Sequence, residues 1–376
     1  MGPAGELTRP SLARLTLRGY KTIRELNPFE PGIITVLIGP NGAGKTNFIS
    51  FFRMLSWTLT PPGNLQTYVA EQGGASRLVH DGPAKTREIE AVLAFHTDAG
   101  TNEYGFRLFH VGGDALVFAH EWYKFERLGV ERPEVPLGGG HRESKLITEA
   151  EGGNQTARFI LGTLRRMIVH QFHNTSATSR MRNKWSASDS RWLKEDAANL
   201  APFLYRLQQS EPKYYQRIVE TIRLILPFFA DFEFQPEYGS LLLRWRERGS
   251  DQVFDASQAG DGMLRAMALV SLLQQPERDL PNVLILDEPE LGLHPYAIEV
   301  LAALLQSAAE HTQVVVATQS VSLVDRFQPH DVVVVERAGR ESTFRRLDDS
   351  ELAEWREQYT LSELWEKNVL GGRPGR

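Results

Sequence analysis

The stretch Ile33-Ile-Thr-Val-Leu-Ile-Gly-Pro-Asn-Gly-Ala-Gly-Lys-Thr46 decides the fold of this chain. Its first six residues form an apolar run that predicts a buried strand. Residues 39–46 fit the pattern G-x-x-x-x-G-K-[ST] of a phosphate-binding loop, and residues 47–55 continue as the opening of a helix. Strand, loop and helix in this order predict a P-loop nucleoside triphosphatase. The alternative is a glycine-rich turn before an ordinary helix.

The loop predicts a set of nucleotide-binding residues and the chemistry of each. Its glycines let backbone N–H groups turn inward around phosphate oxygens, and the helix start adds the positive end of a dipole. Lys45 is expected to reach the β- and γ-phosphates, and the Thr46 hydroxyl is expected to bind Mg²⁺. ATP and Mg²⁺ are therefore the expected ligands. The predicted nucleotide-binding residues are Gly39, Pro40, Asn41, Gly42, Ala43, Gly44, Lys45 and Thr46.

Composition places the chain among globular proteins of ordinary make-up. It has 376 residues, of which 41% are hydrophobic and 24% charged, and a net charge of −5 that argues against wholesale coating of nucleic acid. The absence of cysteine excludes disulfides and thiolate metal sites. The N-terminus has no apolar signal core, and no apolar run approaches the roughly 18 residues of a membrane helix. A cytoplasmic protein without a membrane segment is expected.

Changes in pattern divide the chain into three predicted parts. Residues 1–135 hold the phosphate loop and an antiparallel β subdomain, in which Ser11–Leu17 is expected to be an edge strand. Residues 136–235 are mostly helical, and residues 236–376 return to alternating strands and helices. The fold class is therefore α/β, with a mixed or parallel core sheet and a helical insertion. The meander strands are expected at 88–95, 104–109 and 116–123, the inserted helices at 157–167, 197–209 and 212–226, and a later strand at 240–245.

The middle part contains a basic stretch. From Arg158 to Lys194 there are eight Lys or Arg residues and one acid, Asp189, with Trp185 and Trp192 interleaved. Basic residues with aromatic neighbours are typical of a surface that binds DNA or a partner. The alternative is a solvated insertion with buried tryptophans.

The second half of a nucleotide site follows another buried strand. Residues 282–286 are mostly apolar and end in Asp287 and Glu288. An acid at a strand end can hold Mg²⁺ opposite the β- and γ-phosphates, which suits Asp287. Glu288 points differently and is expected to orient or deprotonate the attacking water. The alternative is the start of a helix.

Four motifs in order give the chain a family resemblance. They are IGPNGAGKTNFI, SQAGDGMLRAMAL, VLILDEPELGLHP and VVVATQS. The chain resembles the ATP-binding-cassette-type ATPase heads of RecF, SMC and OLD-family proteins. It is also similar to a bacterial group of stand-alone AAA-family ATPases, through Asn199-Leu-Ala and the ending at 361–374.

The resemblance implies a homodimer that closes around ATP and hydrolyses it to ADP and phosphate. Each nucleotide would lie between the phosphate loop of one subunit and the signature turn of the other. Gly260, Asp261 and Gly262 take the signature position, where a helix N-terminus would face the γ-phosphate. The alternative for this turn is a plain helix entry.

Two positions depart from the family pattern. Gly260 stands where relatives carry serine, and Gln319 stands where many carry histidine. A neutral glutamine can hydrogen-bond phosphate or water but donates no charge. Hydrolysis is therefore expected to be slow. The residues expected to take part in catalysis are Glu288, Lys45 and Gln319.

Three further assignments rest on the resemblance. In relatives, a glutamine that binds the metal connects the nucleotide site to the helical arm inserted in the head. Two glutamines of this chain could take that place, and Gln171 is favoured over Gln72. His294 occupies a position that relatives use at the subunit interface, and packing is its alternative role. His170 and His173 lack a nearby carboxylate cluster, so they are expected to be structural rather than metal ligands.

Two functions are compatible with these observations. In the first, ATP-driven dimerisation acts on DNA or a DNA-associated partner, in repair or phage defence. In the second, the protein is a slow ATP-gated sensor or scaffold that regulates a separate effector protein. A transporter motor is disfavoured because the strict transporter signature is missing.

Overall fold

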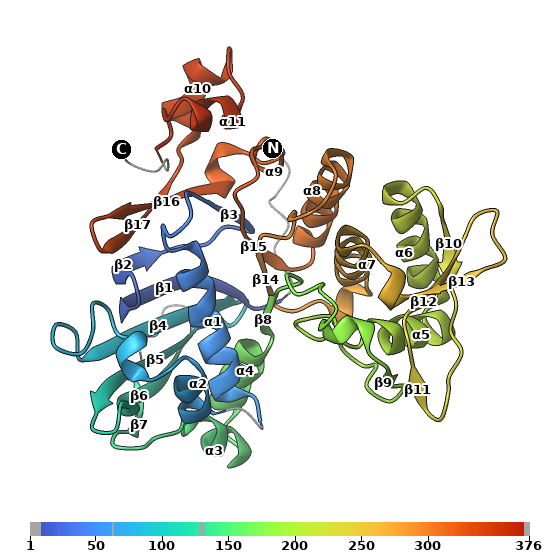
Figure 1. The fold of residues 1–376 in the computed structure, drawn as a ribbon. Helices are drawn as coiled ribbons and strands as arrows, with labels where there is room; N and C mark the ends of the chain where they lie inside the picture. The colour runs from blue at the N-terminus through green and yellow to red at the C-terminus, as the bar shows by residue number, and fades with distance from the viewer. Residues whose placement is uncertain (1–8, 62–63, 128–129, 131, 372–376) are drawn as a thin grey trace.

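The computed structural model describes residues 9–61, 64–127, 130 and 132–371 (Figure 1). A six-stranded sheet, which we call the core sheet, lies at its centre. Five of its strands are parallel to one another, and the sixth, the edge strand β17, pairs antiparallel with β16. In spatial order the strands are β17 (Glu341–Arg346), β16 (Val332–Ala338), β3 (Ile34–Ile38), β15 (Gln313–Ala317), β14 (Val283–Asp287) and β8 (Met167–His170).

Both faces of the core sheet are buried, because successive side chains of a strand point to opposite faces. On β3, Val36 and Ile38 pack in one apolar cluster with helices α5 to α8, whereas Leu37 packs in a second cluster with α1 and α4. The core sheet is thus the middle layer of the molecule. The helices are α1 (Lys45–Leu59), α2 (Leu65–Glu71), α3 (Leu146–Glu151), α4 (Gln155–Arg165), α5 (Leu200–Ser210), α6 (Pro212–Ile225), α7 (Asp261–Leu273), α8 (Pro295–Ala309), α9 (Val321–Val324), α10 (Asp349–Arg356) and α11 (Leu361–Glu366).

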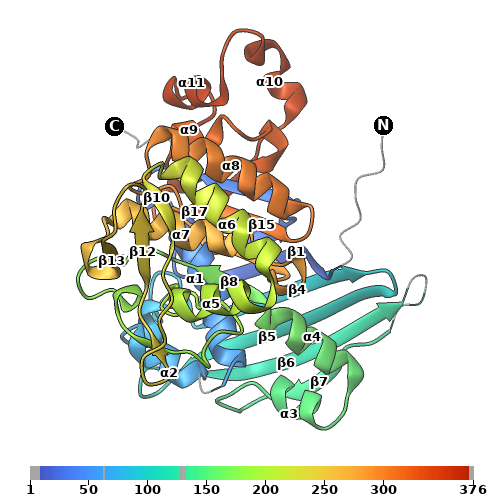
Figure 2. The same ribbon diagram turned by 90° about the vertical axis from the view of Figure 1, so that its right-hand side faces the viewer.

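A second six-stranded sheet is antiparallel throughout and packs on the α1 side (Figure 2). The predicted meander is confirmed as β4, β5 and β6. The prediction that Ser11–Leu17 is an edge strand is wrong, because β1 lies between β2 and β4. In spatial order the strands are β2 (Ile23–Phe29), β1 (Ser11–Tyr20), β4 (Glu88–Thr97), β5 (Gly100–Val111), β6 (Ala115–Arg127) and β7 (Val135–Gly138).

The middle of the chain divides between the two sides of the core sheet. Helix α4 packs in the cluster on the α1 side, and β8 follows it as the edge strand of the core sheet. The predicted helix 157–167 therefore ends two residues early, and Met167 begins a strand. The predicted strand 240–245 is two short strands that join small sheets, one of β10 (Phe229–Phe232), β12 (Arg244–Glu247) and β13 (Val253–Asp255), the other of β9 (Trp185–Ser186) and β11 (Ser240–Leu241).

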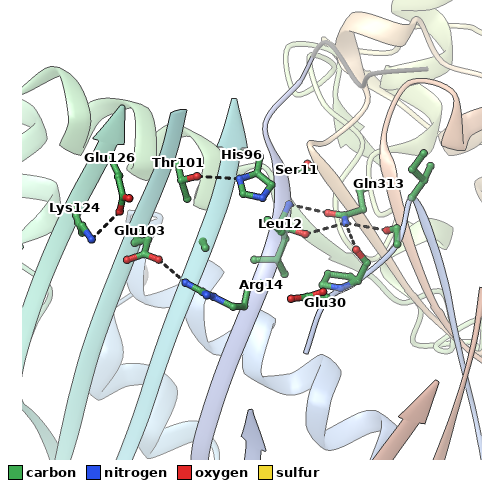
Figure 3. A pocket seen from close by; sticks show the side chains of 15 residues that line it. Ser11, Leu12, Arg14, Glu30, His96, Thr101, Glu103, Lys124, Glu126 and Gln313 are labelled. Carbon is green, nitrogen blue, oxygen red and sulfur yellow. Dashed lines mark hydrogen bonds and ion pairs between the residues drawn. The ribbon is translucent and has the colours of Figure 1, made fainter. Parts of the chain in front are cut away.

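One buried side chain joins the two large sheets. The Gln313 amide accepts a bond from the Leu12 N–H at 2.9 Å and donates to the carbonyls of Leu12 at 3.0 Å and Gly32 at 2.9 Å (Figure 3). It lines a cavity of about 840 Å³ with Arg14, Glu103 and others. This cavity lies at the amino ends of β3 and β15. The phosphate loop follows β3 at the opposite, carboxyl end, where α/β sheets bind ligands.

Among the described residues, no helix is both long enough and apolar enough to cross a membrane. The structure confirms the predicted α/β class, with a mixed core sheet, an antiparallel β subdomain and helices in the middle part. The three-part division at residues 136 and 236 stays a prediction.

Candidate nucleotide-binding site

The phosphate loop has a backbone that only glycine adopts easily. Gly39, Gly42 and Gly44 have φ angles of +150°, +78° and +121°. A Cβ on Gly39 would lie 2.1 Å from the Val335 carbonyl oxygen, and one on Gly44 would lie 2.1 Å from Ser342 Oγ. The loop is therefore packed against the β16–β17 hairpin, which comes some 300 residues later in the chain.

Lys45 and Thr46 begin α1 with different surroundings. Lys45 is 5% exposed, and its ammonium donates to the carbonyls of Gly39 and Pro40. Burial lowers the pKa of Lys45, while the carboxylates of Glu288 and Asp287 act in the opposite direction. Thr46 is exposed. The ammonium thus lies inside the loop with acids nearby, and the hydroxyl faces outward.

Asp287 and Gln171 meet because their strands are neighbours. β14 pairs with β8 so that Leu286 lies opposite His170, which brings the next residues of both strands together. The Gln171 side-chain N–H donates to Asp287 Oδ2 at 2.7 Å. Burial raises the pKa of Asp287, and the bond from Gln171 opposes this shift. Gln72, the other candidate, ends α2, and its side chain has no hydrogen bond to a described residue.

The residues fit a Mg²⁺ ion bound with ATP, with one adjustment. Mg²⁺ prefers hydroxyl, carboxylate and amide oxygens, which Thr46, Asp287 and Gln171 carry. The amide oxygen of Gln171 accepts a hydrogen bond from Arg53. Gln171 could ligate the metal only if Arg53 gives up this bond, whereas Thr46 has no such competitor among the described residues.

Glu288 and Gln319 meet at the next pair of strands. β14 and β15 are parallel, with Asp287 opposite Ala317, and the Glu288 N–H donates to the Ala317 carbonyl at 2.8 Å. Glu288 has a φ of 43°, a left-handed conformation that is uncommon outside glycine. Its carboxylate accepts a hydrogen bond from the Gln319 side chain. The predicted base and the glutamine that replaces the histidine of many relatives are therefore in direct contact.

The signature turn lies away from this cluster. In Figure 1, β8 and β14 lie between α1 and α7, the helix that the turn begins. Gly260 is the N-cap of α7, and Gly260 and Asp261 are exposed. A Cβ on Gly262 would lie 2.5 Å from the Gly292 carbonyl oxygen, so this glycine lets α7 approach the turn after β14. Within the described residues, no hydrogen bond links the turn to the phosphate loop.

Arg265 is a buried residue of the predicted signature motif, to which the sequence assigned no role of its own. Its guanidinium donates to the carbonyl oxygens of Phe172 at 2.9 Å, His173 at 2.9 Å and Leu291 at 2.6 Å. It thereby ties α7 to the loops that follow β8 and β14. Arginine has the fixed fork of donors that such a three-way contact needs.

Replacing Arg265 with methionine is expected to lower the free energy of unfolding by about 3 kcal/mol, because three carbonyls lose a charged donor. Urea denaturation measures this change. Arg278→Met is the matched control, since that side chain is 66% exposed. Equal stability of the two variants would contradict the structural role of Arg265.

Two histidines, His170 and His173, have the surroundings of structural residues. His294 is exposed, is the N-cap of α8 and accepts the Tyr296 N–H at 3.3 Å, and its role at a subunit interface stays a prediction. His173 contacts the Asp287 carbonyl at 2.7 Å through Nε2. Burial lowers the pKa of His170 to about 4, which keeps it neutral at physiological pH. In the part of the chain that the structure describes, no group of three or more His, Asp or Glu could hold a metal.

The fold and the site define a P-loop ATPase head of the ATP-binding-cassette type. The family model described as "AAA domain, putative AbiEii toxin, Type IV TA system" matches residues 34–325, and the chain belongs to this family. No curated protein matches the chain in sequence.

Solved structures of SMC heads share the fold. An Smc head bound to the C-winged helix domain of ScpA has a TM-score of 0.61 at 14% identity, covering 92% of this chain and 99% of that chain. A Pyrococcus furiosus Smc head with an extended coiled coil, bound to the C-terminal domain of ScpA, has a TM-score of 0.61 at 13% identity and covers 93% and 99%. The SMC head from Thermotoga maritima has a TM-score of 0.50 at 16% identity, covering 90% of this chain and 99% of that chain. At these identities the likeness concerns the fold alone.

Proposed function

We propose that this protein is an ATP-binding and hydrolysing head that dimerises around ATP. One observation carries the proposal. Lys45, Asp287, Glu288 and Gln319 converge at the carboxyl ends of adjacent strands, while the exposed turn at Gly260 lies on the other side of β8 and β14. This position supports a role of the turn in the nucleotide site of a second copy. ATP and Mg²⁺ are the proposed ligands, and the cytoplasmic location stays a prediction.

The chemistry of each subunit follows from its own residues. The loop N–H groups and Lys45 would bind the phosphates, and Thr46 and Asp287 would hold the metal, which would neutralise developing charge on the phosphates. Glu288 would take a proton from the attacking water, with Gln319 holding its carboxylate in place. Gly262 packs against Gly292. It would leave the N–H groups at the start of α7 free to bind the γ-phosphate of the ATP held by the partner subunit.

Turnover is expected to be slow, well below about 10 s⁻¹, because Gln319 is neutral and Gly260 has no hydroxyl. Steady-state phosphate release by the wild-type protein measures this rate. A turnover at or above about 10 s⁻¹ would contradict slow catalysis, and no ATP-dependent release at all would contradict the ATPase proposal.

We favour a separate effector protein as the partner over DNA. Seven of the eight cations between Arg158 and Lys194 are bonded within the chain. Arg180 pairs with Asp196, Lys184 with Glu237 and Lys194 with Asp189. Backbone carbonyls accept hydrogen bonds from the others, which are Arg158, Arg165, Arg166 and Arg182. Cations held in this way are less available to phosphate groups.

DNA is the second candidate partner, and one observation supports it. Trp192 is 44% exposed, and the guanidinium groups of Arg166 and Arg191 lie 5.9 Å and 5.3 Å from the centre of its ring. Exposed aromatic rings with arginines are common in nucleic-acid surfaces. Repeating the phosphate-release assay with duplex DNA at two salt concentrations separates the candidates. A salt-sensitive change in rate supports DNA, and no change supports the effector. The family description names a toxin–antitoxin system, which supports a defence role more than repair.

A further inference from the structure

Glu290 is a buried acid beside the two residues that we propose for catalysis. It lies three residues after Asp287, in the turn that leaves β14, and is 8% exposed. Its Oε1 accepts hydrogen bonds from the Thr318 hydroxyl and, at 3.3 Å, from the Gln319 backbone N–H. Both donors directly follow β15, so one carboxylate oxygen joins the turn after β14 to the segment after β15.

The burial of the other carboxylate oxygen of Glu290 costs folding free energy. Oε2 is buried and has no hydrogen-bond partner among the described residues. A buried carboxylate oxygen without a donor loses its hydration, and burial correspondingly raises the pKa of Glu290. A well-packed apolar residue would avoid this cost but would leave the Thr318 hydroxyl and the Gln319 N–H without their acceptor. What the acid supplies is therefore an acceptor for two donors of one segment.

The geometry shows what the acid controls. The Gln319 backbone bonds to Glu290, and the Gln319 side chain bonds to Glu288. The next residue, Ser320, caps the short helix α9. The backbone of Gln319 is thus held between Glu290 on one side and the start of α9 on the other. This fixes the position of the Gln319 Cα, from which the side chain reaches Glu288.

We propose that Glu290 is a positioning residue for ATP hydrolysis, which fixes the end of β15 so that the Gln319 amide holds the Glu288 carboxylate. The inference rests on the proposed ATPase function. Glu290 acts only as an acceptor of two hydrogen bonds in this role. A glutamine can replace it, because its amide oxygen accepts the same two bonds.

The test is a mutant cycle on the full chain. Glu290→Ala is expected to lower kcat about 10-fold with the ATP dissociation constant within about 2-fold of wild type. Glu290→Gln is expected to keep kcat within about 3-fold of wild type. Gln319→Ala should lower kcat by a factor similar to Glu290→Ala, and the double variant should fall no further. Phosphate release gives kcat, and equilibrium binding of a fluorescent ATP analogue gives affinity.

Two further variants guard the interpretation. Thr318→Val removes one of the two donors at a fully buried position without changing its shape, and a drop of about 3-fold in kcat is expected even if Glu290→Ala does not fold. Glu299→Ala, on the exposed face of α8, is the matched control and should behave as wild type.

The outcomes separate the two proposals. A wild-type protein that hydrolyses ATP, with Glu290→Ala equally active, overturns the positioning role alone. Additive losses in the double variant also overturn it, as does a Glu290→Gln variant as impaired as the alanine one. A wild-type protein without hydrolysis overturns the positioning role together with the ATPase function.

Discussion

With ATP present, Glu288→Gln is expected to accumulate as a stable dimer and to lose at least about 100-fold in hydrolysis. Glutamine keeps the size of the side chain and can still accept the bond from Gln319, but it cannot take a proton from water. In the proposed dimer, which opens on hydrolysis, the nucleotide would then remain between the two subunits. Gel filtration with light scattering measures the dimer, and phosphate release measures the rate.

Two comparisons make this result specific. Glu299→Gln changes an exposed acid on α8 and should match wild type in both assays. A Glu288→Gln protein that stays monomeric with ATP would contradict the composite site between two subunits. If the variant dimerises yet hydrolyses ATP at the wild-type rate, the result would support the dimer and contradict the catalytic role of Glu288.

Lys45→Ala is expected to weaken ATP binding by about 100-fold, because it removes the buried ammonium that we propose as a phosphate ligand. The fold should survive the change. The loop is shaped by its glycines and by contacts with Val335 and Ser342 rather than by Lys45. Equilibrium binding of ATP measures the effect, and a thermal melting curve checks the fold.

Lys85→Ala is the matched control for Lys45, since Lys85 is a 70% exposed lysine that pairs with Asp81. It should bind ATP as wild type does. An unfolded Lys45→Ala protein would contradict the view that the glycines shape the loop. ATP affinity of Lys45→Ala within about 3-fold of wild type would exclude the phosphate-binding role.

Local patterns predicted the parts of the site that follow buried strands. β3, β14 and β15 are mostly apolar runs. β14 ends at Asp287, and the phosphate loop and Gln319 follow the ends of β3 and β15. Parallel strands bring their carboxyl ends to one edge, so Lys45, Asp287 and Gln319 could be expected to meet. Gln171 was favoured over Gln72 for a similar reason, and it lies beside Asp287.

Other features depend on contacts between distant residues, which no local pattern contains. Glu290 matters because Thr318 and Gln319 reach it, and Arg265 because three carbonyls from two other loops surround it. The strand β8 has four residues, too few for periodicity to separate it from the helix before it. The alternation of Ser11–Leu17 showed a strand but could not show its neighbours, and β2 contains Pro28, which resembles a turn signal.

The position of β3 has a consequence for synthesis of the chain. Residues 34–38 emerge from the ribosome long before their neighbours in the core sheet, β15 and β16, which begin at residues 313 and 332. Until then both edges of a highly apolar strand lack their final hydrogen-bond partners. Unpaired apolar edges promote association between chains, and pairing across such sequence distances is slow. A nascent chain stopped before residue 313 should therefore require a chaperone to stay in solution, although its phosphate loop is already complete in sequence.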